Sequence, residues 1–309
     1  MKNQLTIAAI LICFIAFAAD AQAPREAAVA AEHAFAARAD QVGTARVFLE
    51  TAAPGALVGE AGVLTGAQDA WKPRLAQPGS CLAWYPVLAD AAQSGDLAYT
   101  TGPWTSGLHG RPQAAGEYVT VWRKQPDGTW KFAVNMGVER IGIAHAKVAY
   151  VPAPRLLAAA ATPSTAPSYI LLDLDRKFAA AELLKPGATY QEYLSAEVRL
   201  YRPGLSMMYG EAAAANMKNL DGRYFFAATG GYLAAGGDLG YVVGTVRRDA
   251  GAQHPEENGS YLRIWRREAV AGWRIVLEMF NFVPGSAPAD TTAGEGARTA
   301  SRLPAQRTQ

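Results

Sequence analysis

The chain has 309 residues, in which 29 Lys and Arg face 27 Asp and Glu, so its formal net charge is +2. This balance, without any basic block, excludes a protein that binds nucleic acid mainly by neutralising phosphates. Half of the residues are hydrophobic, which indicates a globular chain, and the two cysteines are too few for a disulfide framework or a thiolate metal site. At ~150 residues per domain, the length predicts about two domains.

The chain begins with the pattern of a signal peptide. A short, mildly positive start precedes an apolar run over residues 5–18, which is shorter than the ~20 residues of a membrane span. Small residues follow, and we favour cleavage after Ala21 because a cut after Ala23 would leave Pro24 at the new terminus. Residues 1–21 are thus predicted to be a signal peptide, with an uncleaved anchor as the alternative. The mature protein is predicted to be periplasmic or secreted, without stable membrane insertion.

The next segment, residues 24–150, is predicted to be a domain that begins with helices and ends with strands. An Ala-rich helical pattern covers residues 25–39, and a shorter helix and an extended segment follow it. Several strands of alternating polarity come next, separated by Gly-rich turns. The Ala- and Pro-rich stretch 151–167 is predicted to be a linker.

The second half of the chain repeats this order of elements. Landmarks recur at an offset of 142 or 143: residues 95–102 match 237–244, residues 116–123 match 259–266, residues 130–132 match 273–275, and Phe35 matches Phe178. A repeat this long predicts two copies of a whole domain rather than a solenoid, so residues 168–284 are predicted to be the second copy. The remaining residues, 285–309, are predicted to be a disordered tail. Helices followed by a strand meander predict an α+β fold, and no glycine-rich phosphate loop indicates a nucleotide-binding fold.

The last two strands of the first copy are predicted to form a hairpin around the turn at residues 125–128. If Lys124 lies opposite Thr129, side-chain alternation gives the hairpin one apolar face and one mixed aromatic and polar face. The apolar face is the predicted core face and comprises Val119, Val121, Trp130, Phe132 and Val134. The mixed face comprises Tyr118, Thr120, Trp122, Lys131, Ala133 and Asn135, with the counterparts Tyr261, Arg263, Trp265, Arg274, Val276 and Glu278 in the second copy. Such a face suits either a ligand pocket or a wet interface between domains.

Two positions on the mixed face gain charge in the second copy. Thr120 and Asn135 are replaced there by Arg263 and Glu278, which the pairing makes diagonal neighbours across the two strands. Because a lone buried charge is unfavourable, we predict a salt bridge between them that ties the hairpin. A catalytic pair is the alternative.

Four segments carry a resemblance to a known family: residues 82–86 (LAWYP), 94–104 (SGDLAYTTGPW), 118–122 (YVTVW) and 127–131 (DGTWK). They resemble the SnoaL-like group of the nuclear transport factor 2-like, ketosteroid-isomerase-like superfamily, and look closest to a branch of exported bacterial proteins of unknown function. The resemblance is good over residues 25–140 and weaker over 168–283. It implies two tandem cone-shaped domains, each a bent antiparallel sheet wrapped around N-terminal helices. The superfamily includes isomerases, cyclases, dehydratases and non-catalytic binding modules, so the fold alone indicates no reaction.

The catalytic set of the superfamily's steroid isomerases does not carry over to this sequence. Arg202 stands where a carboxylate base would precede Pro203, and the first-helix aromatics have no hydroxyl group. His33, on the first helix, and Glu278 are the candidates for a general base or acid. The four histidines have no metal-ligand spacing, so we predict no metal site and no cofactor.

The favoured hypothesis is a binding module that holds a small apolar or amphipathic ligand in a cone. Its predicted wall in the first domain is Trp84, Tyr99, Tyr118, Thr120, Trp122 and Asn135, and in the second Tyr261, Arg263, Trp265 and Glu278. One alternative is a cryptic isomerase or hydrolase that uses His33 or Glu278. Another is a scaffold in which the two domains pack sheet to sheet as a pseudo-dimer, or in which the chain forms a homodimer. No nucleic-acid partner is predicted.

Overall fold

The computed structural model describes residues 22–76, 80–108, 111–140, 150, 169–219, 222–252 and 254–283. The predicted signal peptide (1–21), linker (151–167) and tail (285–309) lie outside these ranges. None of the helices in the described ranges is long and apolar enough to cross a membrane.

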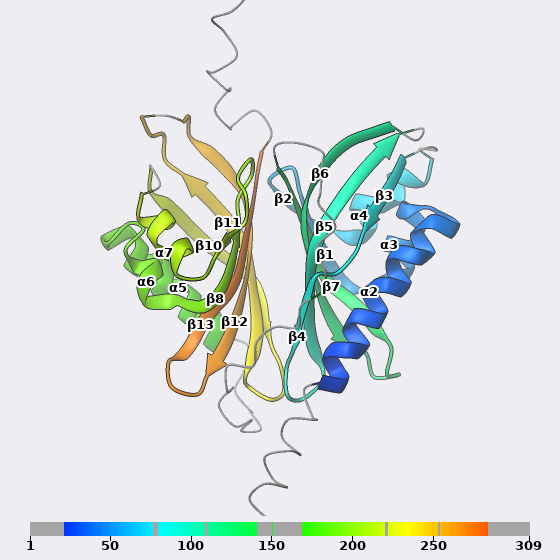
Figure 1. Ribbon diagram of the computed structural model, residues 1–309, viewed down its shortest axis with the longest axis horizontal. Helices are drawn as coiled ribbons and strands as arrows, with labels where there is room; N and C mark the ends of the chain where they lie inside the picture. Colours follow the sequence, from blue (N-terminus) through cyan, green and yellow to red (C-terminus); the bar gives the residue numbers. More distant parts are fainter. Residues whose placement is uncertain are drawn as a thin grey trace, which may run out of the picture.

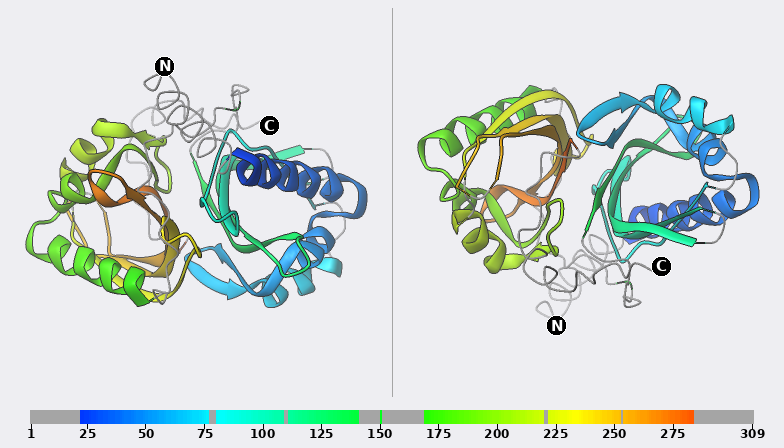
Figure 2. Two further views of the ribbon diagram at one scale, coloured as in Figure 1. Left: turned by 90° about the horizontal axis from the view of Figure 1, so that it is seen from below. Right: turned by 90° about the horizontal axis from the view of Figure 1, so that it is seen from above.

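The first domain consists of helices that lie in the curve of a seven-stranded sheet (Figures 1 and 2). The helical elements are α2 (Gln22–Val42), α3 (Thr44–Thr51), α4 (Ala67–Trp71) and the 3-10 helix η1 (Lys72–Ala76). The strands are β1 (Ala52–Glu60), β2 (Val63–Gly66), β3 (Ser80–Trp84), β4 (Leu88–Ala91), β5 (Leu97–Leu108), β6 (Arg111–Lys124) and β7 (Trp130–Glu139). The sheet order is β2-β1-β7-β6-β5-β3, and β4 also pairs with β5.

The second domain has the same arrangement. Its helices are α5 (Tyr169–Leu184), α6 (Thr189–Tyr193) and α7 (Gly210–Asn219). Its strands are β8 (Leu194–Tyr201), β9 (Met208–Tyr209), β10 (Tyr224–Leu233), β11 (Leu239–Arg248), β12 (Glu257–Glu268) and β13 (Gly272–Phe282). The sheet order β9-β8-β13-β12-β11-β10 corresponds strand by strand to that of the first domain. The fold is therefore two α+β domains, as predicted. Each sheet is mixed rather than purely antiparallel, because β1 pairs with β7, and β8 with β13, in parallel.

Each first helix places an acidic residue in the middle of its buried stripe. Helix α2 buries Ala28, Glu32, Phe35 and Ala39, and α5 buries Leu171, Asp175, Phe178 and Glu182. The spacing of four, three and four residues keeps one face of a helix turned toward the sheet. Glu32 and Asp175 thus enter the interior of their cones from equivalent positions.

The β6–β7 hairpin differs in register from the predicted one. Lys124 lies opposite Trp130 rather than Thr129, so the turn shifts the pairing by one residue and places Phe132 opposite Trp122, on the cone side. Ala133 is then an extra residue at a β-bulge, which shifts the pairing by one more, so Thr120 lies directly opposite Asn135 and Ala133 faces away from the cone. The second domain has the same turn register and the same bulge, so Arg263 lies directly opposite Glu278 rather than diagonal to it.

The outer faces of the two sheets pack against each other, with the helices on the far sides (Figure 1). This interdomain core joins apolar residues of both domains, among them Tyr99, Val121 and Val134 with Tyr241, Ile264 and Leu277. The predicted apolar hairpin face is therefore divided. Val119, Val121 and Val134 face the other domain, whereas Phe132 belongs to the first domain's own cone.

Polar contacts across this interface come in reciprocal pairs. Asp96 accepts a hydrogen bond from the backbone N–H of Ala235 at 3.1 Å, and Asp238 accepts one from the backbone N–H of Gln93 at 2.9 Å. These four positions are related by the sequence offset of 142. The domains thus meet about an approximate two-fold axis, as in an isologous dimer.

Candidate functional site

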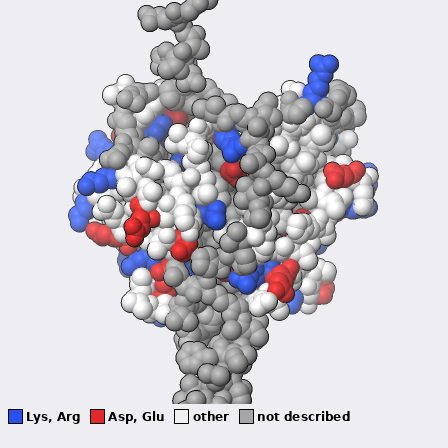
Figure 3. Space-filling view, viewed as in Figure 1, with Lys and Arg blue, Asp and Glu red and all other residues white. Residues whose placement is uncertain are grey.

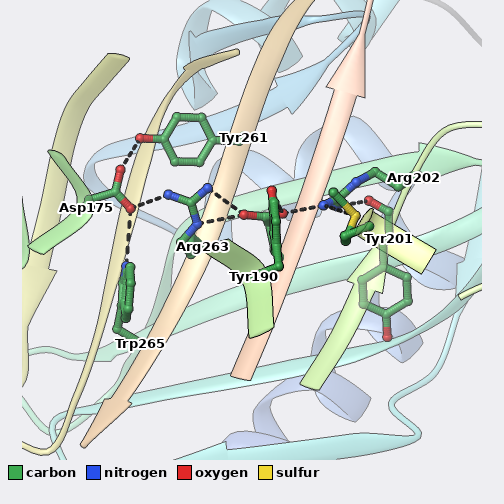
Figure 4. A network of polar contacts seen from close by, with 9 residues as sticks. Asp175, Tyr190, Tyr201, Arg202, Tyr261, Arg263 and Trp265 are labelled. Carbon is green, nitrogen blue, oxygen red and sulfur yellow. Dashed lines mark hydrogen bonds and ion pairs between the residues drawn. The ribbon is translucent and has the colours of Figure 1, made fainter. Parts of the chain in front are cut away.

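Both cones have a buried polar cluster at the centre, and the cluster of the second domain is charged (Figure 4). Arg263, on β12, donates from Nε to Glu278 on β13 at 2.7 Å and from Nη1 to Asp175 on α5 at 2.5 Å. Asp175 also accepts hydrogen bonds from the Tyr261 hydroxyl at 2.6 Å and from the Trp265 indole at 3.3 Å. The predicted salt bridge between Arg263 and Glu278 is confirmed, and it is one link of a larger network.

Glu278 has a second cationic partner. Arg202, which follows β8, forms a buried ion pair with it, and the Tyr190 hydroxyl donates to it at 3.0 Å. Burial favours the neutral acid, but the guanidinium groups of Arg263 and Arg202 outweigh this and lower the pKa of Glu278. With Asp175, the cluster contains two acidic and two basic side chains, whose formal charges cancel.

The cluster of the first domain contains a carboxyl group and no cation. Glu32 is 0% exposed and accepts hydrogen bonds from the indole N–H of Trp84 at 2.6 Å and of Trp122 at 3.0 Å. The hydroxyl of Thr100 also donates to it. Burial raises the pKa of Glu32, and hydrogen bonds from Thr100, Trp84, Trp122 and Thr120 oppose the shift only in part.

A buried tyrosine hydroxyl lies beside this cluster. Tyr118 is 4% exposed, and its hydroxyl interacts with the side chain of Thr100 without reaching standard hydrogen-bond geometry to any described residue. Its counterpart, Tyr261, donates to the helix acid Asp175. Unpartnered buried atoms also occur in the second domain, at Glu182 Oε2 and Arg202 Nε, so what distinguishes the first cone is that its tyrosine does not donate to the helix acid.

Aromatic rings surround the Glu32 cluster. The centroid of the Phe35 ring lies 5.0 Å from that of Trp84 and 5.9 Å from that of Trp122. The side chains of Thr120 and Asn135 complete the cluster, with a hydrogen bond of 3.0 Å from Asn135 Nδ2 to Thr120 Oγ1. The first cone is thus lined by neutral and aromatic groups around one acid.

The structure brings most of the predicted site residues together, but not all. Trp84, Tyr118, Thr120, Trp122 and Asn135 gather in the first cone, and Tyr261, Arg263, Trp265 and Glu278 gather in the second. Tyr99 lies instead in the interdomain core, because its strand position points to the other face of the sheet.

His33, one of the two candidates for a general base or acid, is exposed on α2. The side chains that do gather are buried, and Thr120, Trp122, Arg263 and Glu278 are 0% exposed.

Sequence reasoning missed several members of both clusters: Glu32, Thr100, Asp175, Tyr190 and Arg202. A signal for the two acids was present, since each interrupts an apolar stripe and they recur at an offset of 143. Arg202 and Tyr190 join the network only through the fold, and no local pattern marks them.

The described residues hold no metal centre, and the face seen in Figure 3 has no patch of a single charge sign. They contain no group of three or more His, Cys, Asp and Glu side chains arranged to hold a metal ion. On the face shown in Figure 3, basic and acidic side chains are interspersed rather than gathered into one patch.

Comparison with known proteins finds likeness in structure alone. No protein-family model matches the chain, and no curated protein matches its sequence. A solved NTF2-like protein of unknown function from Pseudomonas putida is 16% identical, with a TM-score of 0.32, over 39% of this chain and 89% of that one. An NTF2-like superfamily protein from Salmonella enterica is 15% identical, with a TM-score of 0.29, over 42% and 96% of the two chains.

An NTF2-like protein with a cystatin-like fold from Novosphingobium aromaticivorans is 20% identical, with a TM-score of 0.30, over 38% of this chain and 82% of that one. These three are among the solved structures to which this chain is similar.

Proposed function

We propose that this protein is a non-catalytic binding protein that takes a small apolar or amphipathic ligand in the cone of its first domain. The observation that carries the proposal is the incomplete cluster around Glu32. The carboxyl group has only neutral partners, and the hydroxyl of Tyr118 has no hydrogen bond of standard geometry among the described residues. A ligand with an apolar body and one polar group would complete this cluster among the aromatic rings.

The second cone supports the assignment to the first. Arg263 already occupies its centre, and the formal charges of the network around it cancel. A ligand there would have to separate buried ion pairs, which is strongly unfavourable. The second domain is accordingly proposed to be a structural partner of the first.

The placement of the catalytic candidates supports the absence of turnover. His33 is exposed and Glu278 is held ionised between two guanidinium groups, so neither is poised to exchange a proton with a ligand in a cone.

Access to the first cone requires side-chain movement. Trp84 and Tyr118 retain 8% and 4% exposure, whereas Thr120 and Trp122 retain none. We therefore expect association to be slower than for an open pocket, because a closed site must open before the ligand enters.

A paired substitution tests the proposal. Small-molecule libraries are screened by tryptophan fluorescence, and each hit is repeated with Trp122→Phe and with the matched change Trp265→Phe in the second domain. We expect Trp122→Phe to weaken binding by about 1–3 kcal/mol, because it removes buried contact area and an indole N–H, and Trp265→Phe to have little effect. Hits that depend on Trp265 alone would place the site in the wrong domain, and a library without hits would defeat the proposal.

An enzyme is the second candidate, because Glu32 itself has the properties of a general acid. A carboxyl group whose pKa is raised by an apolar environment is typical of proton donors at neutral pH. The Glu32→Gln variant distinguishes the two functions. Loss of turnover of a bound compound with binding retained would establish catalysis in place of simple binding.

Export completes the proposal and rests on the apolar run at residues 5–18 and the small residues that follow it. N-terminal sequencing of the protein from its native host is expected to find a start after Ala21 or Ala23. An intact Met1 in a membrane fraction would show an anchor instead.

A further inference from the structure

The cone of the second domain encloses a cationic group, the guanidinium of Arg263. The guanidinium carbon of Arg263 lies 4.2 Å from the centroid of the Phe178 ring, 4.6 Å from Phe226 and 4.8 Å from Tyr261. The same group is paired with Asp175 and with Glu278. A planar cation is thus enclosed by three aromatic rings and two carboxylates, an arrangement that stabilises organic cations.

The first domain has the helix acid and the aromatic rings of this enclosure, without the cation and with Asn135 in place of the second carboxylate, Glu278. The positions of Asp175, Phe178, Phe226 and Tyr261 correspond to Glu32, Phe35, Trp84 and Tyr118. Strand pairing supports the least obvious of these matches, because Trp84 pairs with Trp104 as Phe226 pairs with Val246. Thr120 takes the place of Arg263, so the acid and the rings remain while the guanidinium group is missing.

The hydrogen-bond acceptors that remain available in the first cone match a cationic N–H donor. Glu32 Oε1 accepts one hydrogen bond, from Trp84, and a carboxylate oxygen can accept a second. The hydroxyl of Tyr118 offers a further acceptor. The rings of Phe35, Trp84 and Trp122 supply the π faces that a cation prefers.

Resting on the function proposed above, we propose that the ligand of the first cone carries an alkylguanidinium or alkylammonium group, which pairs with Glu32 where the second domain uses Arg263. The cation would lie between the Glu32 carboxylate and the Tyr118 hydroxyl, and its alkyl chain would pack on the aromatic rings. The ligand class is therefore a small amphipathic organic cation.

The test compares charged and neutral probes of the same shape. Alkylguanidinium ions with chains of four to eight carbons are titrated into the full-length protein and compared with alkylureas of the same lengths. We expect the guanidinium ions to bind at least tenfold more tightly than the ureas, and Glu32→Gln to abolish that difference. Asp40→Asn, an exposed acid on the same helix, is the matched control and should leave binding unchanged.

A second variant tests the correspondence between the domains directly. Thr120→Arg builds the guanidinium group of the second domain into the first, so it should abolish binding of the cations. Should either variant fail to fold, the unaltered protein gives an independent readout. Cation binding should weaken as the pH falls and Glu32 becomes protonated, whereas urea binding should not change.

The outcomes separate this inference from the function on which it rests. If ureas bind as tightly as guanidinium ions and both lose affinity on Trp122→Phe, the first cone binds ligands but the cation inference is wrong. If guanidinium ions bind independently of Glu32 and of pH, the inference is also wrong. If neither probe binds, the inference fails, and the library screen alone decides the proposed function.

Discussion

The acid in the middle of each first helix meets a different environment in the two domains. Asp175 is neutralised by Arg263, whereas Glu32 is held by the uncharged donors Trp84, Trp122 and Thr100. Removing one member of a buried ion pair leaves an uncompensated charge, whereas removing a neutral hydrogen-bond partner has a smaller effect. Equivalent positions should therefore respond differently to substitution.

The first prediction uses this difference. Arg263→Met leaves Asp175 without its cation, and we expect it to lower the free energy of unfolding by about 3–5 kcal/mol. Adding Asp175→Asn should restore part of that loss. Thr120→Val, at the corresponding position, removes one hydrogen bond to Asn135 and should reduce stability by only about 1 kcal/mol. Denaturant unfolding measures all three, and an equal effect at the two positions would contradict the account.

A second prediction concerns Glu182, the last buried residue of α5. Burial raises its pKa to about 7, although the backbone N–H of Gly187 donates to it at 2.7 Å. The folded state then holds a proton more tightly than the unfolded chain, in which the pKa is about 4.5. Stability from this group is therefore fully present below about pH 4.5 and is lost as the pH rises to about 7.

Unfolding measured from pH 4 to pH 8 tests this dependence. Relative to Glu182→Gln, the unaltered protein should lose about 1–3 kcal/mol of stability across that range. Charged groups of the neighbouring network, Glu278, Arg263 and Arg202, remain in both proteins and serve as the common background. Parallel pH curves for the two proteins would show that Glu182 does not titrate as described.

At the scale of single residues, the sequence predicts pairs of interacting side chains more readily than larger polar clusters. The Arg263–Glu278 pair was predictable because two neutral residues of the first copy become opposite charges in the second. The burial of Glu32 was not predicted, because an acid in an Ala-rich helix is ordinarily solvent-exposed. The adjacent residue, His33, was the candidate on this helix instead. The burial of Glu32 depends on the rotation of α2 against the sheet, which is set by Phe35 and its aromatic neighbours.

At the scale of elements, the α+β class and the helices that open each domain followed from the sequence, but the order of the strands in the sheet and the hairpin register did not. Alternation predicts faces correctly only while each residue of one strand has one partner. Ala133 breaks this rule at the bulge, and a small residue between Phe132 and Val134 gives no sign of it. The parallel pairing of β1 with β7 was likewise not predicted, because it joins strands that are distant in the sequence.

The turn between β1 and β2 links the two domains and yields the third prediction. The backbone N–H of Gly62, at a φ of 82°, donates to Asn281 of the other domain at 2.6 Å. A Cβ atom added at Gly62 would lie 2.6 Å from Val283, which is closer than real Cβ contacts allow. Gly62→Ala should therefore combine backbone strain with a clash between domains.

Gly55→Ala is the matched control, since Gly55 also has a positive φ, of 74°, but has open space around its Cβ position. We expect about 1–2 kcal/mol of destabilisation from strain at Gly55, and about 1–3 kcal/mol more at Gly62. Thermal unfolding of both variants measures the difference. Equal losses would mean that the interdomain contact at Gly62 contributes nothing.

At the scale of the whole molecule, the two sheets cover each other's outer faces. The interdomain core joins buried residues from four strands of each sheet, and Asp96 and Asp238 accept reciprocal hydrogen bonds from the backbone of the opposite domain. Each sheet thus has its apolar outer face covered within one chain. The full-length protein is therefore expected to be a monomer, with the face that a homodimer would need already occupied.

The fourth prediction separates the domains. Segments 24–150 and 168–284, expressed individually, each expose one apolar sheet face, and such faces are covered in soluble proteins by association. The charged residues at the edge of the interface do not oppose association of identical segments. Arg266 pairs with Asp90, and at the related position Arg123 lies 4.0 Å from the ring of Tyr232.

In a homodimer of the first segment, Arg123 would therefore meet Asp90, and in one of the second, Arg266 would meet Tyr232. Neither arrangement brings like charges together, so both segments should form homodimers through the exposed face, while the full chain remains monomeric. Light scattering at matched concentrations measures each mass, and replacing Val121 by Glu in the first segment, on the exposed face, should return it to a monomer. Folded segments that stay monomeric, or a full chain that dimerises, would show that the sheet faces do not drive association.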